Sequence, residues 1–189
     1  MRIEILKEDG YEEALFGLGL SYGLTSNMSF DEFCTNKDVF KKVTDVSKKL
    51  YNKDSGHNKF LESMFVWLDV TAPRFVLSEM DTYRLGTKQS ESTIHTIMKT
   101  PFTQDMFEYE IPDTLLNTLE DYRTNNDFIL LKNTLPEGFL QRRIWTLNYK
   151  VLRNIVVQRK NHKLIQWKYF CRFIMANVEH PEYFDDHIV

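Results

Sequence analysis

The alternation of apolar and polar side chains predicts three strands in this chain. RIEILK at 2–7 alternates with a period of two, which is typical of a strand with one buried face. FVWLDVT at 65–71 is rich in β-branched and aromatic residues and predicts a well-buried strand. The segment 139–147 predicts a third strand.

Helical spacing of apolar residues predicts most of the remaining elements. Ser29 and Glu32 have the spacing of a capping box and open a helical pattern that extends to Leu50. Pro73 stands where another helix can begin, with an apolar face that reaches about Arg84. The predicted helices cover 12–20, 29–50, 72–84, a segment beginning at Pro112, 148–157 and 167–176, with a further apolar run at 128–131.

Polar segments that contain glycine or proline predict the loops between these elements. They lie at 52–58, 86–93 and 135–138, and the tail after His180 is expected to be loose. The chain shows no linker and no internal repeat. The pattern therefore predicts one α+β domain over residues 1–189.

Composition narrows the class of protein. The 189 residues are 42% hydrophobic and 27% charged, which is ordinary for a soluble globular protein and excludes wholesale disorder. No apolar run approaches the roughly 18–20 residues that span a bilayer, so no membrane partner is expected. The two cysteines are too far apart in sequence for a metal motif, and no metal site is predicted. The N-terminus turns acidic without an apolar signal core, which favours a cytoplasmic location.

The distribution of charge is more informative than the net charge of −3. No Asp or Glu occurs between Gly138 and Val178, whereas nine cations do: Arg142, Arg143, Lys150, Arg153, Arg159, Lys160, Lys163, Lys168 and Arg172. A stretch of one sign suggests a bound anion, either a nucleic-acid backbone or the phosphate of a small ligand. The alternative is a basic surface that acidic residues elsewhere in the fold neutralise.

Three sequence blocks in order resemble the flavin-dependent thymidylate synthases. APRFVLSEMDTYR at 72–84 is similar to the family's helix A-P-x-F-V, which ends in R-H-R, and Gly56-His57 followed by Glu62 matches its G-H-x-x-x-x-E element. The segment 135–159 matches L-P-x8-W-T-x-N-x-R-x-L-x-N-x4-R, with Lys150 in place of an Arg. Gln166-Trp167 then matches the last two residues of the family's following motif, H-A-Q-W.

The resemblance implies a fold and an activity. The fold is α+β, with a central, mostly antiparallel sheet packed by helices. The activity is C5 methylation, or a related one-carbon alkylation, of a pyrimidine deoxynucleotide such as dUMP by reduced FAD, with NADPH and methylenetetrahydrofolate as co-substrates. The family assembles as a homotetramer with shared sites. The altered motifs suggest a viral or mobile-element source, in which case the location is the host cytoplasm.

The resemblance also implies roles for individual residues. Arg159 is the expected catalytic residue, because its planar guanidinium can hold and polarise the pyrimidine. Asn148 and Asn154 lie six positions apart, about 120° around a helix, and can bracket a flat ring. The cofactor-binding residues implied are His57, Tyr83, Arg84, Asn148, Lys150 and Asn154. The substrate-binding residues implied are Glu79, Ser90, Glu91, Ser92, Thr93, His95, Lys132 and Arg159.

The chain departs from the family at the catalytic loop. Thr82-Tyr83-Arg84 stands where the family has R-H-R, and Ser78-Glu79 stands where it has Arg-Gln. The family's next motif, N-E-x-S-x-R, fits in two registers. Without a gap it falls on Gln89, Ser90, Ser92 and Ile94; with one inserted residue it falls on Ser90, Glu91, Thr93 and His95. We favour the second register because it keeps an acid, a hydroxyl and an imidazole.

Two other functions are compatible with the sequence. One is a catalytically inactive relative that binds or sequesters a nucleotide, which the loss of the Arg-His pair at 82–83 favours. The other is a nucleic-acid-binding protein that uses the basic stretch 138–178. The acidic remainder of the chain weighs against nucleic acid.

Overall fold

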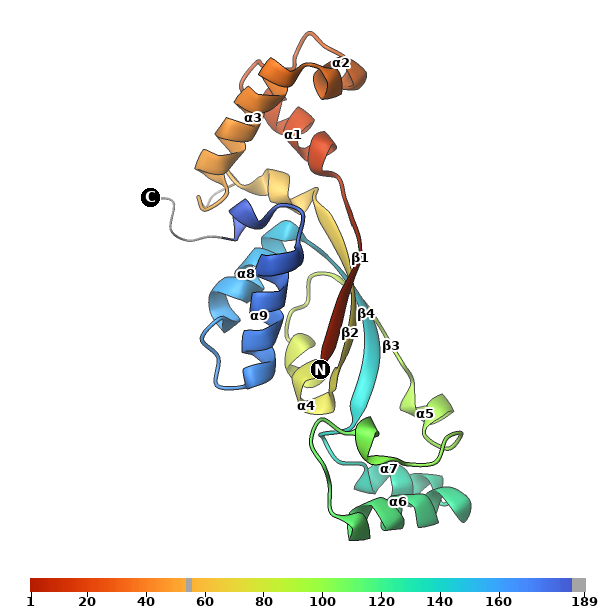
Figure 1. Ribbon diagram of the computed structural model, residues 1–189. Coiled ribbons are helices and arrows are strands. Elements are labelled where there is room, and N and C mark those ends of the chain that lie inside the picture. The colour runs from red at the N-terminus through yellow and green to blue at the C-terminus, as the bar shows by residue number, and fades with distance from the viewer. Residues whose placement is uncertain (54–55, 185–189) are drawn as a thin grey trace. The chain divides into compact units, whose positions relative to one another are not determined.

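A computed structural model of the chain describes residues 1–53 and 56–184. In these residues one antiparallel sheet has the strand order β1-β2-β4-β3 (Figure 1). The strands are β1 (Arg2–Asp9), β2 (Phe65–Pro73), β3 (Thr87–Ser90) and β4 (Leu140–Asn148). The predicted α+β class with a mostly antiparallel sheet packed by helices is confirmed.

The chain divides into two compact units. The first unit comprises 1–4 and 68–145, and the second comprises the remaining residues. The divisions fall inside β1, β2 and β4. The single domain over 1–189 therefore stays a prediction.

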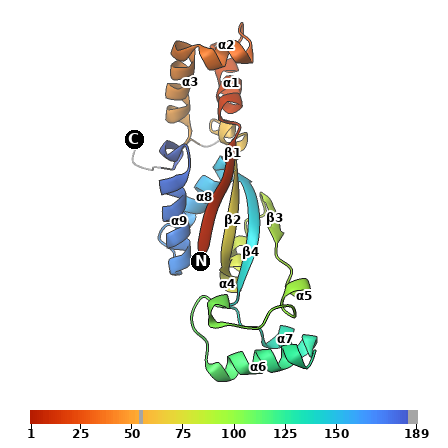
Figure 2. The same cartoon turned by 45° about the vertical axis from the view of Figure 1, so that its right-hand side comes forward.

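The first unit holds four α-helices in its described residues: α4 (Arg74–Met80), α5 (Thr93–Thr96), α6 (Asp113–Thr124) and α7 (Phe128–Thr134), together with the short 3-10 turn η2 (Gln104–Met106). Helices α6 and α7 lie side by side (Figure 2). Their apolar faces share one buried cluster, which consists of Ile97, Phe102, Phe107, Leu119, Leu131, Leu135 and Phe139. This cluster gives the first unit a core of its own.

The second unit contains a helix pair from each end of the chain. Its elements are α1 (Tyr11–Leu20), α2 (Phe30–Thr35), α3 (Lys37–Leu50), α8 (Tyr149–Arg159) and α9 (Ile165–Asn177), with the 3-10 turns η1 (Lys59–Glu62) and η3 (Pro181–Tyr183). Helix α1 packs on α3, and α8 packs on α9 (Figure 1). Trp167, Phe170 and Tyr183 are fully buried and fill this core.

The predicted continuous helix over 29–50 is wrong. The capping box is present, since the Ser29 side chain accepts from the Glu32 N–H and the Glu32 side chain accepts from the Ser29 N–H. The helix that it starts ends at Thr35, because Asn36 leaves the helical conformation (φ −84°, ψ 87°). Asn36 then caps α3 by accepting from the N–H of Val39 at 3.1 Å. A second N-cap thus divides the pattern into two helices.

Three further boundaries differ from the sequence prediction. The segment 86–93 is not a loop throughout, because it contains β3. Helix α4 ends at Met80, four residues before the predicted end. The tail after His180 is not loose as far as it is described, since Tyr183 and Phe184 are buried. Residues 185–189, and positions 54 and 55 of the predicted loop 52–58, lie outside the described residues.

No helix in the described part of the chain is both long enough and apolar enough to cross a membrane.

Candidate functional site

A cavity of about 640 Å³ lies beside His57 in the second unit. Ala14, Leu18, Leu50 and Phe60 give it apolar walls, while His57, Lys59 and Glu62 add polar groups. Gly17 belongs to the lining on α1, and a Cβ at this position meets no atom within 4 Å. The lining therefore combines apolar walls with hydrogen-bonding groups, as small-molecule sites commonly do.

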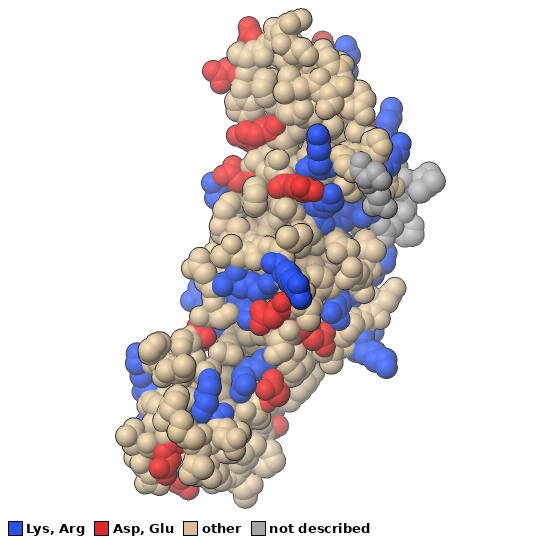
Figure 3. Space-filling view, turned by 180° about the vertical axis from the view of Figure 1, so that it is seen from behind, with Lys and Arg blue, Asp and Glu red and all other residues tan. Residues whose placement is uncertain are grey.

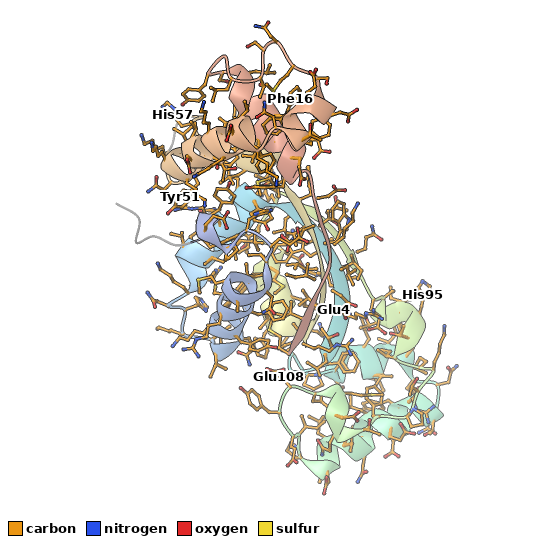
Figure 4. All side chains as sticks on the ribbon, turned by 45° about the horizontal axis from the view of Figure 1, so that its top comes forward. Glu4, Phe16, Tyr51, His57, His95 and Glu108 are labelled. Carbon is orange, nitrogen blue, oxygen red and sulfur yellow. The ribbon has the colours of Figure 1, made fainter. Side chains whose placement is uncertain are left out.

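The loop that carries His57 turns sharply at Gly56, whose φ of +83° is in the region that favours glycine. The side chain of His57 is exposed after this turn (Figure 4). Tyr51, which is also labelled in Figure 4, belongs to the same unit. The predicted cofactor-binding His57 is thus at the rim of an open cavity.

An ion pair joins two of the sequence blocks. Lys150 Nζ lies 2.6 Å from Glu62 Oε1. The backbone N–H of the preceding residue, Tyr149, donates to the carbonyl of Met64 at 2.9 Å. The start of α8 is therefore held against the segment that follows His57, and the predicted cofactor-binding cation at Lys150 has an acidic partner.

The predicted geometry of Asn148 is wrong. Asn148 is the N-cap of α8, in extended conformation (φ −92°, ψ 164°), and its Oδ1 accepts from the Val151 N–H at 2.9 Å. Asn154 is exposed on α8, and its Oδ1 accepts from Gln158 Nε2 at 3.0 Å. The angle of about 120° between two helical residues does not apply, because only one of the two amides is in the helix.

The role of Asn148 as a cap has a measurable consequence. Asn148→Ala should lower the free energy of unfolding by about 1 kcal/mol, because it removes the acceptor for an N-terminal N–H of α8. Asn154→Ala is the matched control, and it should change the stability by less than about 0.5 kcal/mol. Urea unfolding of the two variants measures both values, and equal losses would exclude the capping role.

Arg159 ends α8 and is partly buried. Its Nη1 donates to His162 Nε2 at 2.8 Å. Its guanidinium carbon lies 4.9 Å from the centroid of the buried Trp167 ring. A hydrogen bond and a cation–π contact thus fix the plane of the predicted catalytic arginine.

In the first unit, two nitrogen atoms of the Arg142 guanidinium donate hydrogen bonds to the carboxylate of Asp69. Arg142 Nε lies 3.0 and 2.9 Å from the two carboxylate oxygens, and Nη2 also bonds to Oδ2. Asp69 is buried, and the hydrogen bonds from Arg142 hold the pKa of its carboxyl below the ordinary value. The neighbouring backbone is also paired, because the Glu91 N–H donates to the Arg142 carbonyl at 2.8 Å.

The Asp69 pair predicts a pH dependence of stability. Because its pKa in the folded state is below the unfolded value, the pair stabilises the fold above the unfolded pKa, and this contribution is lost as pH falls through the folded pKa. Asp69→Asn should therefore lower the melting temperature at neutral pH and lose less further stability on acidification than the parent. A melting series between neutral and acidic pH tests this, and parallel curves would contradict it.

Arg143, the next residue on β4, points to the opposite side and is buried. Its guanidinium contacts Asp81, the Leu77 carbonyl and Ser90 Oγ. A cavity of about 520 Å³ is lined here by Gln89, Ser90, Glu91, Arg142, Arg143 and Ile144. Two predicted substrate-binding residues, Ser90 and Glu91, thus line a cavity with two arginines.

Two more predicted substrate-binding residues meet although they are far apart in sequence. Lys132 Nζ donates to Thr93 Oγ1, and Thr93 is buried. Burial, with a smaller effect of the nearby Arg74, lowers the pKa of Lys132.

The remaining predicted residues are more scattered. Ser92 is at the N-cap of α5, and the exposed His95 is on that helix (Figure 4). Glu79 is on α4, and Arg84 is exposed beyond it. The Tyr83 ring centroid lies 6.5 Å from that of Trp145.

Acidic residues from outside the basic stretch 138–178 neutralise some of its positive charges. Among the residues that the structure describes, ion pairs join Arg142 to Asp69, Arg143 to Asp81, and Lys150 to Glu62. On the face shown in Figure 3, Lys and Arg are interspersed with Asp and Glu. The prediction that these cations lack compensation is wrong for these three, and the alternative of a neutralised surface holds for them.

The sequence prediction missed Asp69, Asp81, Arg142 and Arg143 as residues of the site. A signal was present, because Asp69 is an acid within an apolar strand pattern, and a buried carboxylate requires a partner. Consecutive arginines in a strand also necessarily face opposite sides. The pairing of particular acids with particular arginines was not visible, since the partners lie 73 and 62 positions apart.

Comparison with known proteins shows similarity in structure alone. No family model matches the chain, and no curated protein matches it. Two crystal structures of the flavin-dependent thymidylate synthase ThyX from Helicobacter pylori, both with FAD and dUMP, are similar to it with TM-scores of 0.74. They are 16% and 15% identical to the chain; the first match covers 98% of this chain and 99% of that one, and the second covers 98% of each. The chain has the fold of these thymidylate synthases over nearly its whole length.

Proposed function

We propose that the protein is a flavin-dependent enzyme of the thymidylate synthase type, which alkylates C5 of a pyrimidine deoxynucleotide such as dUMP. The observation that carries the proposal is the shared fold with two enzymes bound to FAD and dUMP, across 98% of the chain. The ordered sequence blocks agree with it, because Glu62 and Lys150, which come from two of these blocks, form an ion pair.

The cavity beside His57 is the proposed flavin site. Its volume of about 640 Å³, its apolar walls and its polar groups fit a tricyclic ring with hydrogen-bonding edges. His57 and Glu62 would contact the ring edge, and Lys150 would act beside them through its pair with Glu62. Tyr83, Arg84 and Asn154 stay proposed as cofactor contacts, and Asn148 as one whose Oδ1 already caps α8.

Arg159 is the proposed catalytic residue. Its planar fork of N–H donors would hold a pyrimidine carbonyl and polarise the ring. His162 and Trp167 keep the fork in one plane, so that less conformational entropy is lost when the base binds. When bound, reduced FAD supplies the hydride of this reaction, with methylenetetrahydrofolate as the carbon source and NADPH as the reductant.

Residues of the first unit are proposed to hold the nucleotide. Ser90 supplies a hydroxyl beside Arg143 and Glu91 an acid beside Arg142, and Lys132 with Thr93 supplies a cation and a second hydroxyl. Glu79, Ser92 and His95 complete the proposed substrate-binding set. We also propose that four copies of the chain assemble into a homotetramer in which the subunits share the active sites.

A nucleotide-binding protein without enzymatic activity is the second candidate. The engagement of the Asn148 oxygen in a helix cap, together with Thr82-Tyr83 in place of Arg-His, favours it. Absorbance titration with FAD separates the two. The enzyme should show the visible bands of a bound flavin, whereas protein that binds dUMP but takes up no FAD would exclude the flavoenzyme and support the second candidate.

A further inference from the structure

Residues 81–90, the signature segment, connect the end of α4 to the end of β3. Both ends of this segment are bound by one guanidinium. Arg143 donates to the two carboxylate oxygens of Asp81 at 2.9 and 3.2 Å and to Ser90 Oγ at 2.7 Å. It also donates to the carbonyl of Leu77, in the last turn of α4, at 3.2 Å.

The interior of the segment folds back over the same side of β4. Lys88 Nζ donates to the carbonyl of Tyr83 and lies 5.5 Å from the centroid of the Trp145 ring. Gly86, with a φ of +100°, allows the reversal between them. Because Trp145 is two positions after Arg143 on a strand, the two side chains point to the same side, so that they contact the segment at its ends and in its middle.

The burial of Arg143 makes these contacts hard to replace. Its side chain is 7% exposed, whereas that of Asp81 is 55% exposed. A buried guanidinium that loses its acceptors has no water to compensate, so the folded state keeps Arg143 bonded to both ends of the segment. An exposed arginine in an ordinary surface ion pair would not constrain the chain in this way.

We propose that Arg143 is a positioning residue that sets the place of the signature segment, and through it the place of Tyr83, Arg84 and the adjoining Glu91. The placement of the segment follows from the contacts of Arg143. Its effect on ligand binding rests on the proposed function, in which these residues contact cofactor and nucleotide.

Trypsin tests the placement without any ligand, because the segment contains its own cleavage sites at Arg84 and Lys88. Arg143→Met keeps a long apolar stem and removes the guanidinium. Cleavage after Arg84 and Lys88 under native conditions should become at least about fivefold faster, because the open form of the segment is more populated. Arg123→Met is the matched control, since it removes another ion-paired arginine, on α6, and one trypsin site. Mass spectrometry of the fragments should show parental rates for the control.

A second variant covers the case in which Arg143→Met does not fold. Asp81→Ala removes a half-exposed partner and should accelerate the same two cleavages. If the two residues act through one contact, adding Asp81→Ala to a folded Arg143→Met should produce little further acceleration. Parental cleavage rates in both single variants would overturn the proposal.

Affinity for dUMP shows whether the segment matters for binding. Arg143→Met should bind dUMP at least about tenfold more weakly than the parent, and Arg143→Lys should recover part of the loss because it keeps a charge but not the fork. Unchanged affinity in a variant with faster cleavage would overturn the effect on the ligand and leave the segment's placement intact. A parent that binds neither dUMP nor dCMP would instead overturn the proposed function.

Discussion

Replacement of Gly17 by phenylalanine is expected to weaken flavin binding strongly without unfolding the protein. Gly17 lies on α1 in the lining of the cavity beside His57, and a Cβ at this position has open space around it. A phenyl ring at this lining position is expected to fill part of the cavity that is proposed to hold the flavin ring. FAD affinity should fall by more than about tenfold, and an absorbance titration measures the loss.

Gly17→Ala is the matched control for this experiment. A methyl group leaves most of the cavity of about 640 Å³ open, so FAD affinity should stay at the parental value. Alanine also favours the helix over glycine by up to about 1 kcal/mol, so the control should be as stable as the parent or more stable. If Gly17→Phe is folded and binds FAD as tightly as Gly17→Ala, the flavin does not use this cavity.

Arg159→Ala is expected to weaken pyrimidine nucleotide binding by about 1.5–3 kcal/mol, which is the usual range for hydrogen bonds to a charged group. The loss follows from the proposed contact between the guanidinium and the base. Folding should be largely retained, because the Trp167 ring remains buried among apolar neighbours after its contact with Arg159 is removed. Calorimetric titration with dUMP and with dCMP measures the affinity, and a melting curve measures the stability.

Arg172→Ala is the control for the loss of a positive charge. Arg172 is an exposed residue of α9 in the same basic stretch, so its removal changes the net charge equally. It should leave nucleotide affinity nearly unchanged. Equal losses in the two variants would show that Arg159 acts only through the general field of the stretch, and outright unfolding of Arg159→Ala would show that it is structural.

Much of the fold could be predicted from the sequence because its buried elements have strong patterns. The strand at 65–71 is apolar except for Asp69 and the terminal Thr71, and it forms most of β2. Strand β3 gave no such signal, since TKQS is a short polar segment at the edge of the sheet with largely exposed side chains. The break at Asn36 was hidden for another reason: apolar spacing continues across it, and only the local cap separates α2 from α3.

The candidate site was less predictable than the fold. Family resemblance indicated Lys132 and Thr93, and the structure brings their side chains together. It did not indicate that Asn148 caps α8, because an Asn before a helix and an Asn within it differ by a single residue of the boundary. The pairs made by Arg142 and Arg143 arise from strand pairing and helix packing, which spacing along the chain does not show.

The most direct measurement of the central claim is the formation of product. The protein is incubated with FAD, NADPH, methylenetetrahydrofolate and either dUMP or dCMP, and the nucleotides are analysed by mass spectrometry. The account predicts a pyrimidine nucleotide heavier than its substrate by the added one-carbon group, formed only when FAD is present and not formed by Arg159→Ala. Unchanged dUMP and dCMP with protein that takes up no FAD would contradict it.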